Sequence, residues 1–170
     1  MDLRKEILRE NSREHTLRIA DWVSVDARRV TQLVQVFLHD EYRVVQRAAW
    51  IISYVAHKSP ALIVPHLPAM VQRMDDAGIP IAVKRNVTRV LQFLPIPPDL
   101  HGPVMHHCFA LLENPKETTA VRAFSMTVLA NLAQEYPDIR NEIRIILEDQ
   151  LTQKNGPGFV TRAKKVLKML

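Results

Sequence analysis

The sequence predicts an all-α fold, arranged as a right-handed α-α superhelix of about four helix pairs with a capping helix at the C-terminal end. Val45, Val83, Val121 and Val160 recur at intervals of 38, 38 and 39 residues, and the apolar residues around them have helical spacing. Only 4 of the 170 residues are glycine, which leaves few places for hairpins or flexible linkers. A period of this length is typical of stacked helix pairs, each of which shelters its neighbour's apolar face.

The same register continues beyond these four valines. Apolar residues recur seven positions after them, at Ile52, Val90, Val128 and Leu167. We therefore predict one domain over 1–170, divided into four repeats and a capping half-repeat, at approximately 1–39, 40–78, 79–117, 118–156 and 157–170.

The first repeat is irregular. Residues 2–23 are helical in character, but Asn11 and Ser12 could either interrupt one long helix or cap a second helix that begins at Arg13. The next helix is clearer, because Asp26 suits an N-cap position. Its predicted buried stripe consists of Val30, Leu33, Val34 and Phe37.

In the second repeat, residues 39–41 are expected to cap a helix that follows directly. We expect Val45, Ala48, Ala49, Ile52 and Ala56 to line its buried face. Pro60 should open the return helix. Pro65 and Pro68 fit only in a first helical turn, so the continuous part should run over about 66–74 after a short preceding turn.

The remaining helices follow from the repeat and from proline and glycine breaks. They are expected at about 80–94, from Leu100 or Pro103 to Glu113, at 118–135, at 137–153 and over the last thirteen residues. The last of these carries apolar residues in the repeat register, so it should bury Val160, Ala163 and Leu167 as a cap. As a basic amphipathic helix it could alternatively lie on an anionic membrane, but the register favours capping and no membrane contact.

Charge and composition narrow the choice of partner. The net charge is +5, and residues 154–170 contain five basic residues and no acidic one, so the rest of the chain is neutral in sum. Proteins that follow a phosphate backbone usually spread their basic residues along a groove. Extended nucleic-acid binding is therefore disfavoured.

The chain has no feature of secretion or of membrane insertion. Its first ten residues are charged throughout, and no apolar run reaches the length of a bilayer. The single cysteine, Cys108, falls on an apolar position of the repeat, where a small buried residue in a reducing compartment is expected. We predict a soluble, cytoplasmic protein.

Three segments resemble the first helix of the HEAT repeat, a member of the armadillo-type solenoids. They are DEYRVVQRAA at 40–49, NPKETTAVRA at 114–123 and, without the opening Asp, GIPIAVKRN at 78–86. The resemblance implies a binding scaffold without a shared catalytic site. It also implies that the second helices line a concave face where partners dock.

The residues expected to point from that face form the predicted partner site. They are Arg28, Arg29, Gln32, His66, Arg73, His106 and His107. We predict that they hold a protein or peptide partner of acidic character; alternatively, they are ordinary solvated helix faces. Trp50, four residues before Tyr54, could add an exposed aromatic patch or could pack under the N-terminal helix.

No enzyme, metal site or cofactor is predicted. His101, His106, His107 and Cys108 have zinc-ligand chemistry, but they are not three or four residues apart, as ligands on one helix face should be. No phosphate-binding loop or nucleophile motif is present.

The alternative function is a nucleic-acid-binding or DNA-base-repair protein of HEAT-like architecture. Asp21, Trp22, Arg47 and Trp50 supply residue types found in the bacterial alkylpurine DNA glycosylases. Arg47 and Trp50 lie on a first helix, however, whereas the resemblance requires them on the concave side.

Overall fold

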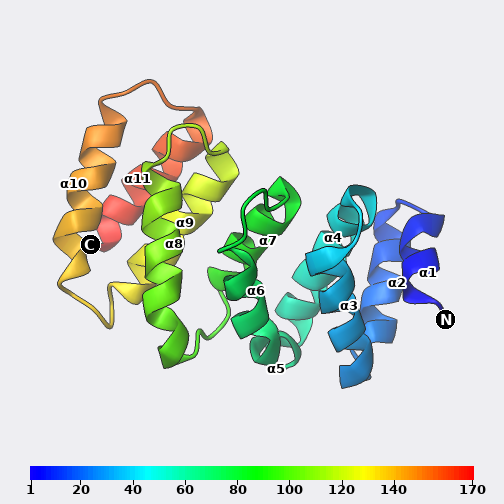
Figure 1. Cartoon of the computed structure of the whole chain (residues 1–170). Helices are drawn as coiled ribbons and strands as arrows, with labels where there is room; N and C mark the ends of the chain where they lie inside the picture. The colour runs from blue at the N-terminus through cyan, green and yellow to red at the C-terminus, as the bar shows by residue number, and fades with distance from the viewer. The chain divides into compact units, whose positions relative to one another are not determined.

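The computed structural model describes residues 1–170 and is helical throughout, with no strand (Figure 1), which confirms the predicted all-α class. The chain forms two compact units. Unit 1 comprises Met1–Val90 with Leu94–Pro97, and unit 2 comprises Leu91–Phe93 with Pro98–Leu170. The boundary falls inside the third predicted repeat, whose first helix belongs almost wholly to unit 1 and whose second belongs to unit 2.

The N-terminal segment forms two helices, α1 (Leu3–Arg9) and α2 (Arg13–Val23). Glu10 is fully extended, with φ −148° and ψ 148°, which ends α1. The Ser12 hydroxyl then accepts a hydrogen bond from the His15 N–H at 3.1 Å and caps α2. Of the two arrangements that the sequence allowed, the capped second helix is the one observed.

Helix α3 (Ala27–His39) begins as predicted, because the Asp26 carboxylate accepts a hydrogen bond from the Arg28 N–H at 2.8 Å. Its four predicted stripe residues have no exposed surface. The predicted cap of α4 (Tyr42–Lys58) is wrong in detail: Glu41 occupies the N-cap position without a side-chain capping bond. The Asp40 carboxylate instead binds Arg4 of α1 at 3.0 Å, so it joins two helices.

Helix α4 is the centre of unit 1, where it contacts α1, α2, α3 and α5 (Figure 1). All five of its predicted core residues are buried, and Ala48, Ala49 and Ala56 allow neighbouring backbones to approach closely. Burial of so many apolar side chains on one helix supplies most of its stability, at about 25 cal/mol per Å² of apolar surface removed from water.

The prolines shape the return helix of the second repeat as predicted. Pro60 opens the short helix α5 (Pro60–Ile63), a 3-10 turn η1 (Val64–His66) follows, and α6 (Leu67–Arg73) is the continuous part. Gly78, at φ 70°, turns the chain towards α7 (Ile81–Leu91). Helix α7 ends three residues earlier than predicted, although Leu94 is still buried.

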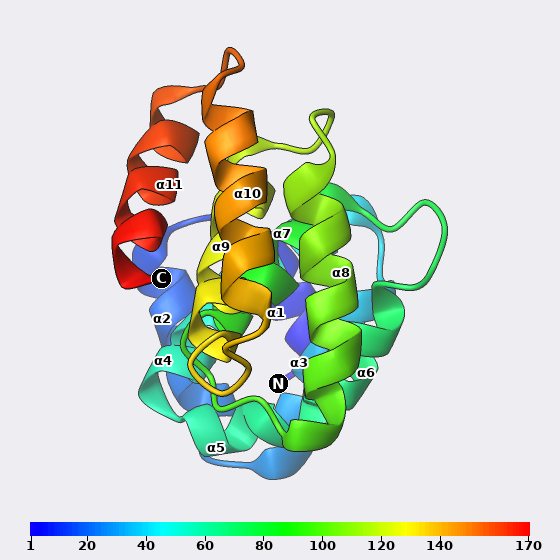
Figure 2. The same cartoon turned by 90° about the vertical axis from the view of Figure 1, so that its left-hand side faces the viewer.

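Unit 2 contains the 3-10 turn η2 (Pro98–Leu100) and four helices: α8 (His101–Glu113), α9 (Thr119–Leu132), α10 (Ile139–Leu151) and α11 (Pro157–Met169). Helix α9 contacts each of the other three helices. Figure 2 shows it behind α10, with α8 and α11 on either side. Its start is capped by the Thr118 hydroxyl, which accepts a hydrogen bond from the Val121 N–H at 3.3 Å.

The buried face of α11 differs from the prediction. Phe159, Ala163 and Val166 are buried, whereas Val160 and Leu167 are only half-buried. The helix is therefore turned by about one residue from the repeat register. Phe159 explains the turn, because its ring lies 4.3 Å from the guanidinium carbon of Arg122 and fills the space against α9. The helix still packs on α9 and α10, as a cap should.

Candidate interaction surface

Helix α3 presents a polar row on one side and a buried apolar row on the other. Arg28, Gln32 and Gln35 are exposed along its length. Beside them, α3 and the start of α1 enclose a recess of about 480 Å³. The recess is lined by Met1, Asp2, Leu3, Arg4, Thr31, Gln32, Gln35 and Val36. It therefore combines apolar walls with amide and hydroxyl groups, as sites for peptide side chains do.

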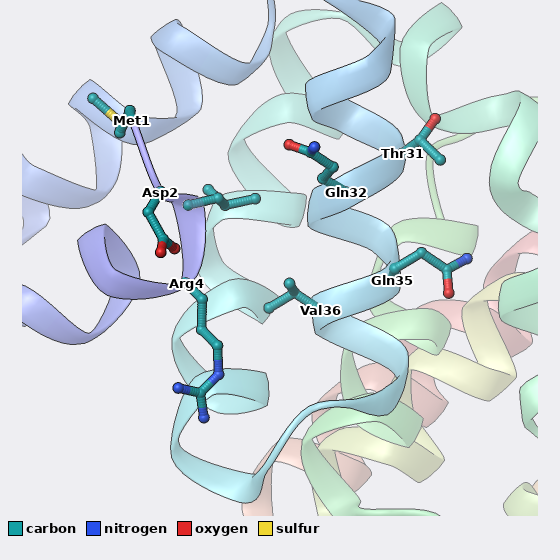
Figure 3. A pocket seen from close by; sticks show the side chains of 8 residues that line it. Met1, Asp2, Arg4, Thr31, Gln32, Gln35 and Val36 are labelled. Atoms are coloured by element: carbon teal, nitrogen blue, oxygen red, sulfur yellow. The ribbon is translucent and has the colours of Figure 1, made fainter.

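Figure 3 shows how these side chains lie. Gln32 and Val36 point from α3 towards the segment that carries Met1 and Asp2, whereas Thr31 and Gln35 point away from that segment. Arg4 holds the wall of the recess in place, since it binds Asp40 at 3.0 Å and Glu41 at 3.1 Å. The hydrogen bond with Asp40 raises the pKa of Arg4.

Two of the predicted basic residues are engaged within the chain. The Arg29 guanidinium lies 4.1 Å from the centre of the Trp22 ring and donates to the Trp22 carbonyl at 2.8 Å. Arg73 donates to the Leu38 carbonyl at 3.0 Å and pairs with Asp76 at 2.8 Å. Arg28 has no such ion pair. The α3 side of unit 1 is therefore less cationic than the sequence suggested.

His66 does not add charge to this side at neutral pH. It lies in η1 and is half-buried, and desolvation by burial lowers its pKa below the ordinary histidine value. The neutral imidazole can exchange hydrogen bonds with a partner but attracts an acidic one weakly.

The predicted site is divided between the two units. His106 and His107 lie on α8 in unit 2, where their ring centres are 5.6 Å apart.

His101 is buried and its Nδ1 is 2.9 Å from the Tyr136 hydroxyl. No three histidine, cysteine or acidic side chains lie close enough together to hold a metal ion.

Cys108 is a buried structural residue. It is 1% exposed, and burial raises the pKa of its thiol to about 12, although a hydrogen bond with Ser125 opposes the rise. A buried thiol with so high a pKa is a poor nucleophile at neutral pH.

Trp50 lies on α4 and is 50% exposed, so an aromatic patch at this position stays a prediction. Tyr54 is half-buried. Both line a second recess of about 250 Å³, beside Asn11, Ser12, Arg13 and Thr16. The Arg89 guanidinium lies 5.0 Å from the centre of the Trp50 ring.

Among the residues that suggested DNA repair, Arg47 and Trp50 line a common recess, whereas Asp21 and Trp22 take part in separate contacts. Asp21 pairs with Lys58, and Trp22 lies beneath Arg29. Arg47 donates to the carbonyls of Ile7 at 3.1 Å and Leu8 at 2.9 Å, which satisfies free carbonyl groups at the end of α1. The side chains of Asp21 and Lys58 are both more than half exposed, so their ion pair contributes little to stability.

A family model described as a HEAT repeat domain matches residues 3–170. The chain belongs to this HEAT repeat family. Neither the comparison with curated proteins nor the comparison with solved structures found a match. HEAT repeat domains characteristically act as protein-interaction scaffolds, and membership of the family suggests that role for this chain. None of the helices is both long enough and apolar enough to cross a membrane.

Sequence reasoning missed the part that the N-terminal residues play in the α3 recess. Asp2 and Arg4 were not predicted as site residues, because the path of residues 2–23 was left open. A local signal existed: the Asp2 side chain accepts a hydrogen bond from the Lys5 N–H at 3.2 Å, which is an ordinary N-cap arrangement. Recognising it would have started α1 at Leu3 and placed these residues beside a neighbouring helix.

Proposed function

We propose that this HEAT repeat domain is a non-enzymatic scaffold that binds a protein or peptide partner on the second-helix side of unit 1. The observation that carries the proposal is the recess of about 480 Å³ between α3 and the start of α1, beside the exposed row Arg28, Gln32 and Gln35. A partner peptide could insert one side chain between Leu3 and Val36 while its backbone exchanges hydrogen bonds with the Gln32 amide.

Arg29 pairs with Asp26 and Arg73 pairs with Asp76, and these ion pairs narrow the kind of partner that we expect. With these charges compensated and His66 neutral, polar and apolar contacts contribute more to binding than acidic character does. Only Arg28 offers an uncompensated charge on this side. We therefore expect a weak dependence of binding on salt, since few opposite charges are brought together.

Affinity purification from extracts of the cells that express the protein, followed by mass spectrometry, tests the proposal. A variant with Gln32→Arg and Val36→Glu should lose the partner, because it fills the recess and buries a charge there. Lys154→Glu, at an exposed position of unit 2, is the matched control and should retain it. Retention of every partner by the double variant, provided that its thermal unfolding is unchanged, would exclude this side of unit 1.

A further inference from the structure

A second surface of unit 1 has the opposite chemistry. Between the first helices α4 and α7 lies a recess of about 360 Å³, lined by Asn11, Arg43, Gln46, Arg47, Trp50 and Arg85. Three arginines, two amide residues and one tryptophan therefore line it, and no acidic residue does. This recess is called the arginine pocket below.

No ion pair within the chain offsets the positive charge of the arginine pocket. The acidic residues of unit 1 are largely paired elsewhere, for example Asp40 with Arg4, Asp21 with Lys58 and Asp76 with Arg73. No carboxylate lies within ion-pair distance of Arg43, Arg47 or Arg85. The charge of Arg85 also contributes to lowering the pKa of the neighbouring Arg89, which is due first to burial. Like charges are thus held close together.

The three arginines are arranged on a rigid frame. Arg43 and Arg47 are four residues apart on α4, so their side chains leave the same face of the helix, about 6 Å apart at Cβ. Arg47 is fixed by its hydrogen bonds to the carbonyls of Ile7 and Leu8. Arg85 comes from α7, where it is half-buried. The Arg47 guanidinium is thus already ordered, so it loses little freedom when it binds an anion, which favours affinity.

Trp50 connects the arginine pocket with the recess of about 250 Å³ beside Tyr54, because Trp50 and Asn11 line both. A ligand in the arginine pocket can therefore continue past the indole into a less charged space. The ligand should carry an anionic group next to an apolar group, rather than being a free ion.

We propose that the arginine pocket binds the phosphoryl group of a phosphorylated side chain in a partner protein, and that the recess beside Tyr54 takes an apolar residue next to it. A phosphoryl group at neutral pH has a charge of about −1.5 to −2 and three acceptor oxygens, which matches several guanidinium groups around one space. A carboxylate offers one charge and two oxygens. The charge excess is compact rather than spread along a groove, which favours a single phosphoryl group over a nucleic-acid backbone.

Titration of the full-length, ¹⁵N-labelled protein with a synthetic peptide, followed by NMR, tests this proposal. The peptide contains one phosphoserine followed by leucine between neutral residues. We expect saturable shifts of the Arg43 and Arg85 Nε–Hε signals and of the Trp50 indole N–H, with no shift at Arg28. The same peptide with serine or glutamate in place of phosphoserine should bind at least about 10-fold more weakly, because charge-assisted hydrogen bonds are lost.

Arg43→Gln and Arg85→Gln should each weaken binding of the phosphopeptide by about 10-fold or more. Neither side chain has a bond that holds the fold together, so both variants should unfold at the wild-type temperature. Arg28→Gln, on α3, is the matched control and should bind normally. The α3 recess is thus tested by different residues, and either proposal can fail alone.

Three results would overturn the proposal. Equal affinity for the phosphoserine and glutamate peptides would show that the pocket recognises negative charge alone and does not distinguish a phosphoryl group from a carboxylate. Unchanged binding by both glutamine variants would place the phosphoryl group elsewhere. Tighter binding of a single-stranded oligodeoxythymidylate than of the phosphopeptide, with the same signals shifted, would make the surface a nucleic-acid site.

Discussion

Arg122 offers the most direct test of how unit 2 is held together. It is 5% exposed, and its guanidinium donates to the Leu112 carbonyl at 3.2 Å, to the Asn155 side-chain oxygen at 2.9 Å and to the Gln150 side-chain oxygen. It also stacks on Phe159 at 4.3 Å. One side chain of α9 thus connects the end of α8, the end of α10 and the cap α11.

We predict that Arg122→Met lowers the free energy of unfolding by about 3 kcal/mol. Hydrogen bonds from a charged donor contribute about 1.5–3 kcal/mol each, and a buried acceptor left without a donor costs about 1–3 kcal/mol. The buried guanidinium itself loses hydration, which offsets part of this sum. Methionine keeps an unbranched apolar stem against Phe159, so the loss reflects the hydrogen bonds rather than a cavity. For a chain of this length, we expect a melting temperature lower by roughly 6–12 °C.

Urea unfolding followed by circular dichroism measures this difference. Arg144→Met makes the same substitution at a half-buried position of α10 where the side chain has no ion pair, and its effect should stay within about 0.5 kcal/mol. Arg122→Lys should fall between the two, because one ammonium group cannot reach all three acceptors. Equal stability of Arg122→Met and Arg144→Met would refute the reasoning, since the cost of burying the charge would then equal everything that its bonds contribute.

Three further predictions concern single buried or half-buried groups. Asn86 is 3% exposed, and its Nδ2 has no hydrogen-bond partner. Asn86→Leu should therefore raise the free energy of unfolding, measured in urea, by about 1–2 kcal/mol. A lower free energy of unfolding would mean that the amide has a hydrogen-bond partner in solution. Cys108, with a thiol pKa of about 12, should react with a disulfide reagent at pH 8 only after unfolding, and fast modification of the native protein would contradict its burial. Burial lowers the pKa of His66, and at high pH the imidazole is neutral in both the folded and the unfolded chain. As pH falls below about 6.5, the unfolded chain takes up a proton first. The free energy of unfolding should therefore fall there and level off below the pKa of the folded state. His66→Gln should remove that part of the pH dependence, and an unchanged profile would show that other groups cause it.

The helical repeat could be predicted because its signals are local and recur. The fully buried Val45, Val83 and Val121 follow from a spacing that a single strand or an irregular loop could not maintain. The division of residues 2–23 was open because Asn and Ser serve equally as interruptions and as caps, and only the Ser12 bond to the His15 N–H decides between them.

The register of α11 and the character of the candidate surfaces depend on contacts distant in sequence. Periodicity placed Val160 in the core, but the larger ring of Phe159 packs better against Arg122, and tertiary packing overrides a repeat pattern at its last member. The charge of Arg29 and Arg73 and their three-residue spacing from Asp26 and Asp76 were visible in the sequence, whereas their bonds to the Trp22 and Leu38 carbonyls required the fold. Arg43 and Arg47 had a readable i, i+4 spacing, but Arg85 joins them only when α7 packs beside α4.

The central claim is that unit 1 binds a protein partner through the α3 side, and site-specific photo-crosslinking tests it most directly. A benzophenone amino acid placed at Gln32 should yield a discrete crosslinked species in extracts of the cells that express the protein. The same group at Gln153, exposed just after α10 in unit 2, should not. Crosslinking at Gln153 without crosslinking at Gln32 would contradict the claim and would move the partner site to unit 2.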